Sequence, residues 1–104
     1  MSGQTHQGTC PVERTARLVG GKWTLLIIRD LAEGCKRFGE LQKSLRGISP
    51  RTLSQRLGLL AKEGLITRRI FAEVPPRVEY SLTEKGQALL PLIEEMREYG
   101  GRWL

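Results

Sequence analysis

Residues 49–63, SPRTLSQRLGLLAKE, carry the clearest structural signal in the chain. Serine before proline marks a helix start, because the Ser49 hydroxyl can cap a free backbone N–H and Pro50 has no N–H to leave unpaired. The leucines recur at helical spacing on one face, at Leu53, Leu57 and Leu60. Gly64 follows as an end signal. The pattern predicts a helix over residues 50–63 that packs its leucine face on a core.

The other face of this helix carries side chains that suit DNA bases. The residues opposite the leucines are Arg51, Gln55, Gly58 and Lys62. Thr52 lies to one side, near the amino-terminal end, and Arg56 flanks the core. Arginine can bond guanine O6 and N7, and glutamine can bond adenine N6 and N7. The helix start also offers N–H groups and a positive dipole to a phosphate. Surface helices often carry such residues for solubility alone, so the face by itself leaves both interpretations open.

The flanking segments favour the DNA interpretation. Residues 38–45 predict a helix of two turns before Gly47, and two helices joined by a short turn match a helix-turn-helix. Residues 65–71 and 77–82 have the composition and alternation of strands. The prolines of residues 72–76 cannot donate to a ladder and belong in the turn. A hairpin after a helix-turn-helix matches a wing.

Helices are also expected at both ends of this unit. Pro11 opens a first helix that ends at Gly20-Gly21, and a strongly apolar one covers residues 22–32. Thr83 caps a last helix over residues 84–103. Its apolar stripe consists of Leu89, Leu90, Leu92, Ile93, Met96, Tyr99, Trp103 and Leu104. So wide a stripe favours a homodimer, and packing back on the chain's own first helices stays open as the alternative.

Length and composition predict one folded domain. With 104 residues and 39% apolar content, the chain is not of the weakly hydrophobic, disordered class. We expect residues 1–9 to be a flexible polar leader and 10–104 the domain, with dimerisation helices at about 10–20 and 84–103. No signal peptide is evident, and the nearly apolar run 25–28 is too short to span a bilayer. A cytoplasmic protein without a membrane partner is expected.

The formal charge of +6 is concentrated in the middle of the chain. Residues 36–80 contain ten Lys and Arg against four Glu, whereas residues 1–35 carry a net +1 and residues 81–104 a net −1. A basic surface that served only solvation would spread this charge more evenly. The distribution predicts a polyanionic partner, nucleic acid before a membrane surface.

Catalytic and metal chemistry are not indicated. The single histidine, His6, lies in the polar leader, and the two cysteines, Cys10 and Cys35, are 25 residues apart. That set lacks the spacing of a zinc site. No nucleophile–base pair stands out either. We therefore expect no metal, no cofactor and no enzymatic activity.

Other cations are weaker candidates for DNA contacts. Lys36 and Arg37 form a short extended link before residue 38 and are expected to clamp the DNA backbone. Arg77 follows the proline turn and could enter the minor groove or grip a phosphate, although an exposed turn arginine is an equal alternative. Arg68 and Arg69 are neighbours on a strand and point to opposite faces, so at most one should touch DNA.

Three stretches of the chain resemble the HxlR-type branch of winged-helix bacterial transcription regulators. They are CPVERTARLVGGKWTLLIIRDL, KRFGELQKSLRGISPRTLSQRLGLLAKEGLI and EVPPRVEYSLTEKG. The likeness covers about residues 10–104. It implies a dimeric DNA-binding regulator of MarR-like shape, in which the first and last helices form the dimer contact.

The resemblance also implies roles for individual residues. It places Arg77 on the wing, and the recognition helix then holds Ser49, Arg51, Thr52, Gln55 and Arg56. The chain departs from the family at two positions. Cys35 stands where proline is frequent, and Gly58 stands where a longer side chain is usual. The second departure leaves the base preference along that turn open.

Cys10 is the residue with candidate reactive chemistry. A helix start favours a thiolate, and Arg14 lies one turn along. Several members of the resembling family sense oxidants or reactive carbonyls through a cysteine at this position. The alternative is a small apolar residue that seals the helix start. Cys35 is expected to be structural, and a bond between the two cysteines depends on geometry that sequence does not provide.

Together these patterns predict a mainly α fold with a small β-hairpin: a winged helix-turn-helix with a three-helix core, a wing and terminal dimerisation helices. The predicted function is sequence-specific transcription regulation by a homodimeric repressor on a pseudo-palindromic DNA operator. Cys10 is the expected sensor of oxidants or electrophiles, and a small-molecule effector is the other source of control. The alternative function is a winged helix for protein contact or non-specific nucleic-acid binding.

Overall fold

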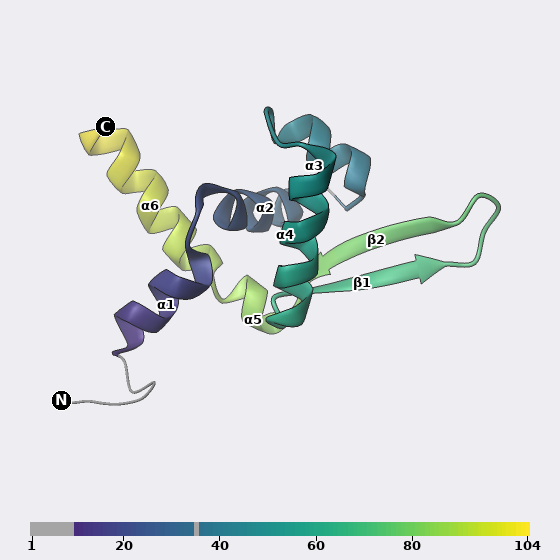
Figure 1. Cartoon of the computed structure of the whole chain (residues 1–104). Helices are drawn as coiled ribbons and strands as arrows, with labels where there is room; N and C mark the ends of the chain where they lie inside the picture. The colour runs from purple at the N-terminus through teal and green to yellow at the C-terminus, as the bar shows by residue number, and fades with distance from the viewer. Residues whose placement is uncertain (1–9, 35) are drawn as a thin grey trace.

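A computed structural model describes residues 10–34 and 36–104, which form six helices and one antiparallel two-stranded sheet (Figure 1). The elements are α1 (Pro11–Val19), α2 (Lys22–Ala32), α3 (Phe38–Ser44), α4 (Pro50–Lys62), β1 (Ile66–Phe71), β2 (Arg77–Leu82), α5 (Glu84–Gln87) and α6 (Leu90–Trp103). The hairpin extends from one side of the body, and α1 and α6 extend from the opposite side. This is the predicted winged helix-turn-helix. The leader 1–9, with His6, and Cys35 lie outside the described residues.

The core is formed where α2, α3 and α4 meet the base of the hairpin. Its fully buried side chains come from α2, α3 and α4 and from the residues that directly follow α3 and precede β1: Ile27, Ile28, Leu41, Leu45, Leu53 and Leu65. Leu57 and Leu60 are 2% and 3% exposed, so the leucine face predicted for the helix after Ser49 is confirmed. Burial of these aliphatic groups is the main force that fixes the orientation of α4.

The hairpin continues the body outwards as a narrow ribbon. Its register pairs Ile66 with Leu82 at the base and Phe71 with Arg77 at the far end. Ile66 is buried and Leu82 packs against the core, so the base is anchored. The link before α3, which consists of Lys36 and Arg37, lies beside β2, because the Tyr80 N–H donates a hydrogen bond to the Lys36 carbonyl over 2.8 Å. The link adds this hydrogen bond without becoming a third strand.

The last helix differs from the prediction, because two helices, α5 and α6, replace one continuous helix over 84–103. Pro91 lies in the first turn of α6 and has no N–H to donate to the carbonyl of Gln87, so α5 cannot continue through it. The predicted cap is confirmed: the Thr83 hydroxyl accepts a hydrogen bond from the Gly86 N–H over 3.1 Å. The domain limits themselves stay a prediction.

Helix α5 is joined closely to the end of α4. Three hydrogen bonds connect them: Thr83 N–H to the Leu65 carbonyl at 3.0 Å, Thr83 Oγ1 to the Gly64 carbonyl at 2.6 Å, and Lys85 Nζ to the Glu63 carbonyl at 2.7 Å. A Cβ atom at Gly86 would collide with the Leu65 carbonyl oxygen. Only glycine lets the two backbones approach this closely.

Helices α1 and α6 present apolar side chains that the chain itself does not cover. Within α1 no residue is buried, and Val12 is 77% exposed. Leu89 and Ile93 are buried at the start of the last segment, but Met96 is 50% and Trp103 66% exposed. Packing back on the chain's own helices therefore covers only part of the predicted stripe. No helix in the described part of the chain is long and apolar enough to cross a membrane.

Candidate nucleic-acid interface

The turn between α3 and α4 is held from inside the body. Leu45 and Ile48, on either side of it, are 2% and 6% exposed, and the Ile48 N–H donates to the Leu45 carbonyl over 3.1 Å. Gly47 has a φ of +90°, a left-handed conformation that side chains disfavour. The turn thus fixes the start of α4 relative to α3, as a helix-turn-helix requires.

The outward face of α4 has the composition that the sequence predicts. Its exposed residues are Arg51, Gln55, Gly58 and Lys62. The buried leucines lie on the opposite side of the same helix, so these side chains cannot turn into the core. Their exposure is confirmed, and their contacts with DNA stay a prediction.

Ser49 and Thr52 serve the start of α4. The Ser49 hydroxyl accepts a hydrogen bond from the Thr52 N–H over 3.0 Å and donates to Thr52 Oγ1 over 2.9 Å. The predicted cap is therefore confirmed. Both hydroxyls are engaged with each other, and the capped Thr52 N–H leaves the positive end of the helix dipole as what this helix start offers to a phosphate.

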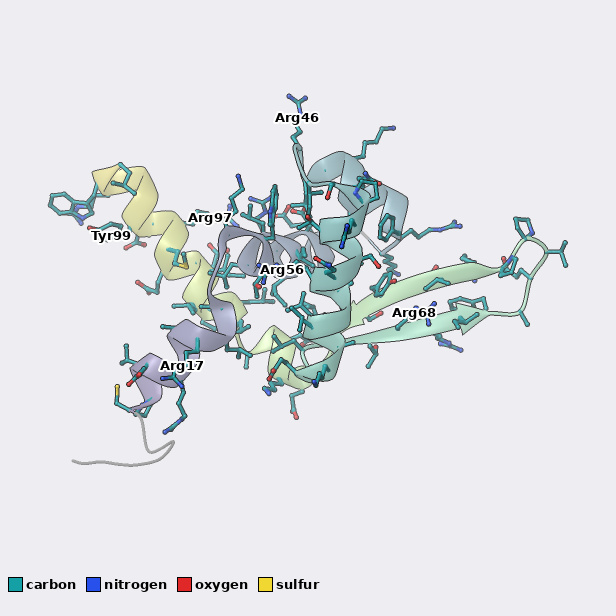
Figure 2. All side chains as sticks on the ribbon, viewed as in Figure 1. Arg17, Arg46, Arg56, Arg68, Arg97 and Tyr99 are labelled. Atoms are coloured by element: carbon teal, nitrogen blue, oxygen red, sulfur yellow. The ribbon has the colours of Figure 1, made fainter. Side chains whose placement is uncertain are left out.

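Arg56 lies apart from the outward set. It is half-buried, and its guanidinium is next to the turn between α1 and α2 (Figure 2): a Cβ atom at Gly21 would lie 3.5 Å from Arg56 Nη2. The predicted position beside the core is confirmed. A direct base contact by Arg56 would require the side chain to leave this place.

At the start of α3, the backbone of two exposed cationic residues is bound by one carboxylate. Glu40 Oε1 accepts hydrogen bonds from the backbone N–H groups of Lys36 at 2.8 Å and Arg37 at 3.0 Å. These hydrogen bonds, together with the nearby positive charges, lower the pKa of Glu40 below its ordinary value. Both cationic side chains stay exposed, where a phosphate could be reached. Arg46, which the sequence analysis did not single out, also points away from the body at the turn before α4 (Figure 2).

A buried carboxylate that the sequence analysis missed supports the helix pair. Asp30 is 2% exposed in α2. Its Oδ1 accepts from Arg29 Nε over 2.9 Å, and its Oδ2 accepts from Ser44 Oγ over 2.7 Å. The contact ties α2 to the last residue of α3. The available signal was a single acid within the apolar run of residues 24–32.

Arg77, the arginine of the wing, makes more contacts within the chain than an exposed turn residue would. Arg77 Nη2 lies 3.0 Å from Glu73 Oε2, and Nη1 lies 3.6 Å from Glu79 Oε2. Its guanidinium stacks 4.0 Å from the centre of the Phe71 ring. Two carboxylates thus compensate its charge in the isolated chain. DNA contact by Arg77, which stays a prediction, would require exchange of at least one carboxylate for phosphate.

Arg68 and Arg69 lie on opposite faces of the hairpin, as predicted. Arg68 pairs with Tyr80 in the register, whereas Arg69 pairs with Glu79. The Arg69 guanidinium lies 4.8 Å from the centre of the Phe71 ring, so it shares this ring with the wing arginine. Figure 2 shows Arg68 on the ribbon between α4 and the hairpin tip.

The outward face of α4, the link and all the charged residues of the hairpin belong to residues 36–80, the segment that carries the net charge of the chain. Such a surface attracts the phosphates of a duplex. Within residues 10–34 and 36–104, no cluster of three His, Cys, Asp or Glu side chains could hold a metal ion. The positive charge of residues 36–80 suits this surface to binding a polyanion.

The chain is similar to known proteins in both sequence and structure. The model of the HxlR-like helix-turn-helix family matches residues 18–104. The transcriptional regulator YdeP of Bacillus subtilis (strain 168), described as HTH-type, is 43% identical over 94 residues, which cover 90% of this chain and 73% of that protein. A MarR-family structure from Porphyromonas gingivalis W83 has a TM-score of 0.84 at 40% identity, covering 97% of this chain and 99% of that one.

The reduced form of the redox regulator HypR has a TM-score of 0.84 at 39% identity, covering 89% of this chain and 92% of that one. The chain belongs to the HxlR-like helix-turn-helix family and is a transcriptional regulator with a DNA-binding winged helix.

Proposed function

We propose that the protein is a homodimeric repressor that reads a pseudo-palindromic operator with α4 in the major groove. The observation that carries this proposal is the orientation of α4: its leucines are buried, and Arg51 and Gln55 project from the opposite face. These side chains have the bidentate geometry that distinguishes guanine and adenine. The operator is expected in the chromosome, which makes the cytoplasm the place of action.

The dimer is supported by an apolar groove between α1, α2 and α6. The groove has a volume of about 450 Å³ and is lined by Pro11, Val12, Thr15, Ala16, Val19, Leu25, Leu92 and Met96. An exposed apolar surface of this kind is typical of a subunit interface. A second copy is the proposed occupant, because a two-fold axis would place two α4 helices on successive half-sites.

Cys10 is the proposed sensor of oxidants or electrophiles. Its side chain is exposed at the start of α1, and its Sγ accepts a hydrogen bond from the Glu13 N–H over 3.4 Å. HypR, similar in structure to this chain, is named a redox regulator and has been solved in oxidised and reduced forms. Peroxide would convert the Cys10 thiolate to a sulfenic acid with release of hydroxide, which breaks this cap next to the proposed dimer groove.

The test of the DNA function is selection of bound fragments from random DNA at two salt concentrations. A regulator of this kind enriches one inverted-repeat sequence at both concentrations, and Arg51→Ala changes the preferred base at one position of each half-site. Binding without enrichment, lost as salt rises, would instead support the non-specific nucleic-acid module.

The sensor is tested separately by comparing operator affinity before and after treatment with hydrogen peroxide or N-ethylmaleimide, which alkylates the thiol. We expect both treatments to weaken binding by the wild-type protein and to leave Cys10→Ser unchanged. Arg17→Gln is the matched control, because it keeps the cysteine and changes an exposed residue of the same helix that lies outside the groove. Equal affinities in all treated and untreated proteins would exclude Cys10 as the sensor.

A further inference from the structure

A second, smaller pocket lies between α2 and α6, on the other side of Leu25 and Met96 from the apolar groove. It has a volume of about 220 Å³ and is lined by Leu25, Leu26, Arg29, Ile93, Met96 and Arg97. Sites for drug-sized ligands span roughly 300–1,000 Å³, so the pocket suits a smaller molecule. Its lining combines flexible aliphatic side chains with two guanidinium groups.

Both arginines have capacity for a further acceptor. The Arg29 side chain is 33% exposed and uses Nε for Asp30, and a guanidinium has five N–H donors in a planar fork. Arg97 lies 3.8 Å from Glu33 Oε2 and 3.4 Å from Glu94 Oε2. These distances exceed the roughly 2.7–2.9 Å of a strong charge-assisted hydrogen bond. Figure 2 shows Arg97 on the side of α6 that faces α2.

We propose that this pocket binds a small aliphatic carboxylate. The hydrocarbon chain lies against Leu26, Ile93 and Met96, and the carboxylate accepts hydrogen bonds from Arg29 and Arg97. Charge selects the ligand class, because a neutral molecule leaves the arginine donors unmatched and an amine is repelled by both. The flexible side chain of Met96 lets hydrocarbon chains of different shape fit in the pocket.

The pocket has a direct connection to the helix-turn-helix. Arg29 also holds the buried Asp30, whose second oxygen holds Ser44 at the end of α3. A carboxylate on the remaining Arg29 donors draws the guanidinium towards the pocket and away from Asp30, which disturbs the contact that positions α3. Binding of the ligand should therefore lower operator affinity. This consequence rests on the proposed function, whereas ligand binding does not.

The first test is calorimetric titration of the full chain with hexanoate, with hexanol and hexylamine as probes of equal chain length. We expect hexanoate to bind at millimolar concentration and the other two to give no binding heat. Arg97→Gln should weaken hexanoate binding about tenfold through loss of a charged hydrogen bond, and Arg29→Lys should weaken it as well. Arg102→Gln, on the same helix but outside the pocket, should bind like the wild type.

Thermal melts of each variant identify those that fail to fold, and Arg97 is the safer position because its side chain is 54% exposed. The proposal is overturned if hexanoate gives no heat, if hexanol binds equally well, or if folded Arg97→Gln binds as tightly as the wild type. None of these results depends on DNA.

The second test is operator affinity with and without hexanoate. We expect a reduction of about fivefold in the wild type, a size typical of coupling between two sites. Ser44→Ala should keep hexanoate binding and lose most of this reduction. An unchanged operator affinity at saturating hexanoate overturns the coupling. Failure to find any specific DNA site, with hexanoate binding intact, contradicts the proposed function and leaves the pocket in place.

Discussion

Helix α4 and the two terminal helices, α1 and α6, use apolar residues in opposite ways. In α4, Leu53 is fully buried and Leu57 is 2% exposed, and their burial leaves a charged face outside. In α1 and α6, Val12 and Trp103 are 77% and 66% exposed. The chain therefore completes its own core around α4 but leaves an apolar surface at its ends. The difference separates the residues that complete the fold from those that are left for the proposed dimer.

The largest expected effect is on the completed core. Leu53→Ala should lower the free energy of unfolding by about 2–5 kcal/mol, because it removes buried methyl groups and leaves a cavity. Leu59→Ala is the matched control on the same helix, since Leu59 is 51% exposed, and should change stability by less than about 0.5 kcal/mol. Urea unfolding measures both. Similar losses in the two variants would contradict the orientation of α4.

The next effect concerns assembly. Val12→Asp and Met96→Asp place charges on the apolar groove and should weaken dimer formation about a hundredfold, or about 3 kcal/mol. Sedimentation velocity measures the dimer fraction, and circular dichroism checks that the fold is kept. Glu95→Gln, on α6 and exposed, should not change assembly. A monomeric wild-type protein at micromolar concentration would contradict the homodimer.

The third effect concerns the recognition of DNA bases by α4. Arg51→Ala and Gln55→Ala should each relax discrimination at one base position, at a cost of about 1–3 kcal/mol. Lys36→Ala should instead weaken binding to all sequences and reduce the salt slope by about one. Titrations against specific and scrambled duplexes at several salt concentrations separate the two. If the α4 variants and Lys36→Ala behave alike, the reading face has been assigned to the wrong side of the helix.

The smallest effect is a pH dependence at the entry to α3. The pKa of Glu40 is lowered in the folded chain because its carboxylate accepts two backbone hydrogen bonds. Folding therefore favours the ionised form, and its contribution is present above the ordinary pKa of about 4.3 and lost as the pH falls through the lowered value. Urea midpoints at neutral and acidic pH should differ less for Glu40→Gln than for the wild type. An identical pH dependence would exclude this role.

The sequence predicts α4 more completely than the contacts that hold the surrounding elements in place. Ser49, Pro50 and the leucines of α4 act through local spacing, so their roles could be derived without a structure. The partners of Asp30 and Arg77 could not, because Ser44 lies 14 residues from Asp30 and the Phe71 ring meets Arg77 only once the hairpin forms. The break before α6 was readable in Pro91, but the apolar periodicity on both sides of it favoured one helix.

The contact at Gly86 has a consequence for how such a regulator is tuned. Because the backbones of Gly86 and Leu65 meet without an intervening side chain, α5 and the residue that leads from α4 into β1 cannot slide past each other, and a change in the direction of one is passed to the other. Over the 55 Å length of the molecule, a tilt of about 4° displaces the far end by roughly one 3.4 Å base step. In the proposed dimer, mutations in the terminal helices can therefore adjust the distance between the two half-sites, with no change in the residues proposed to contact the bases.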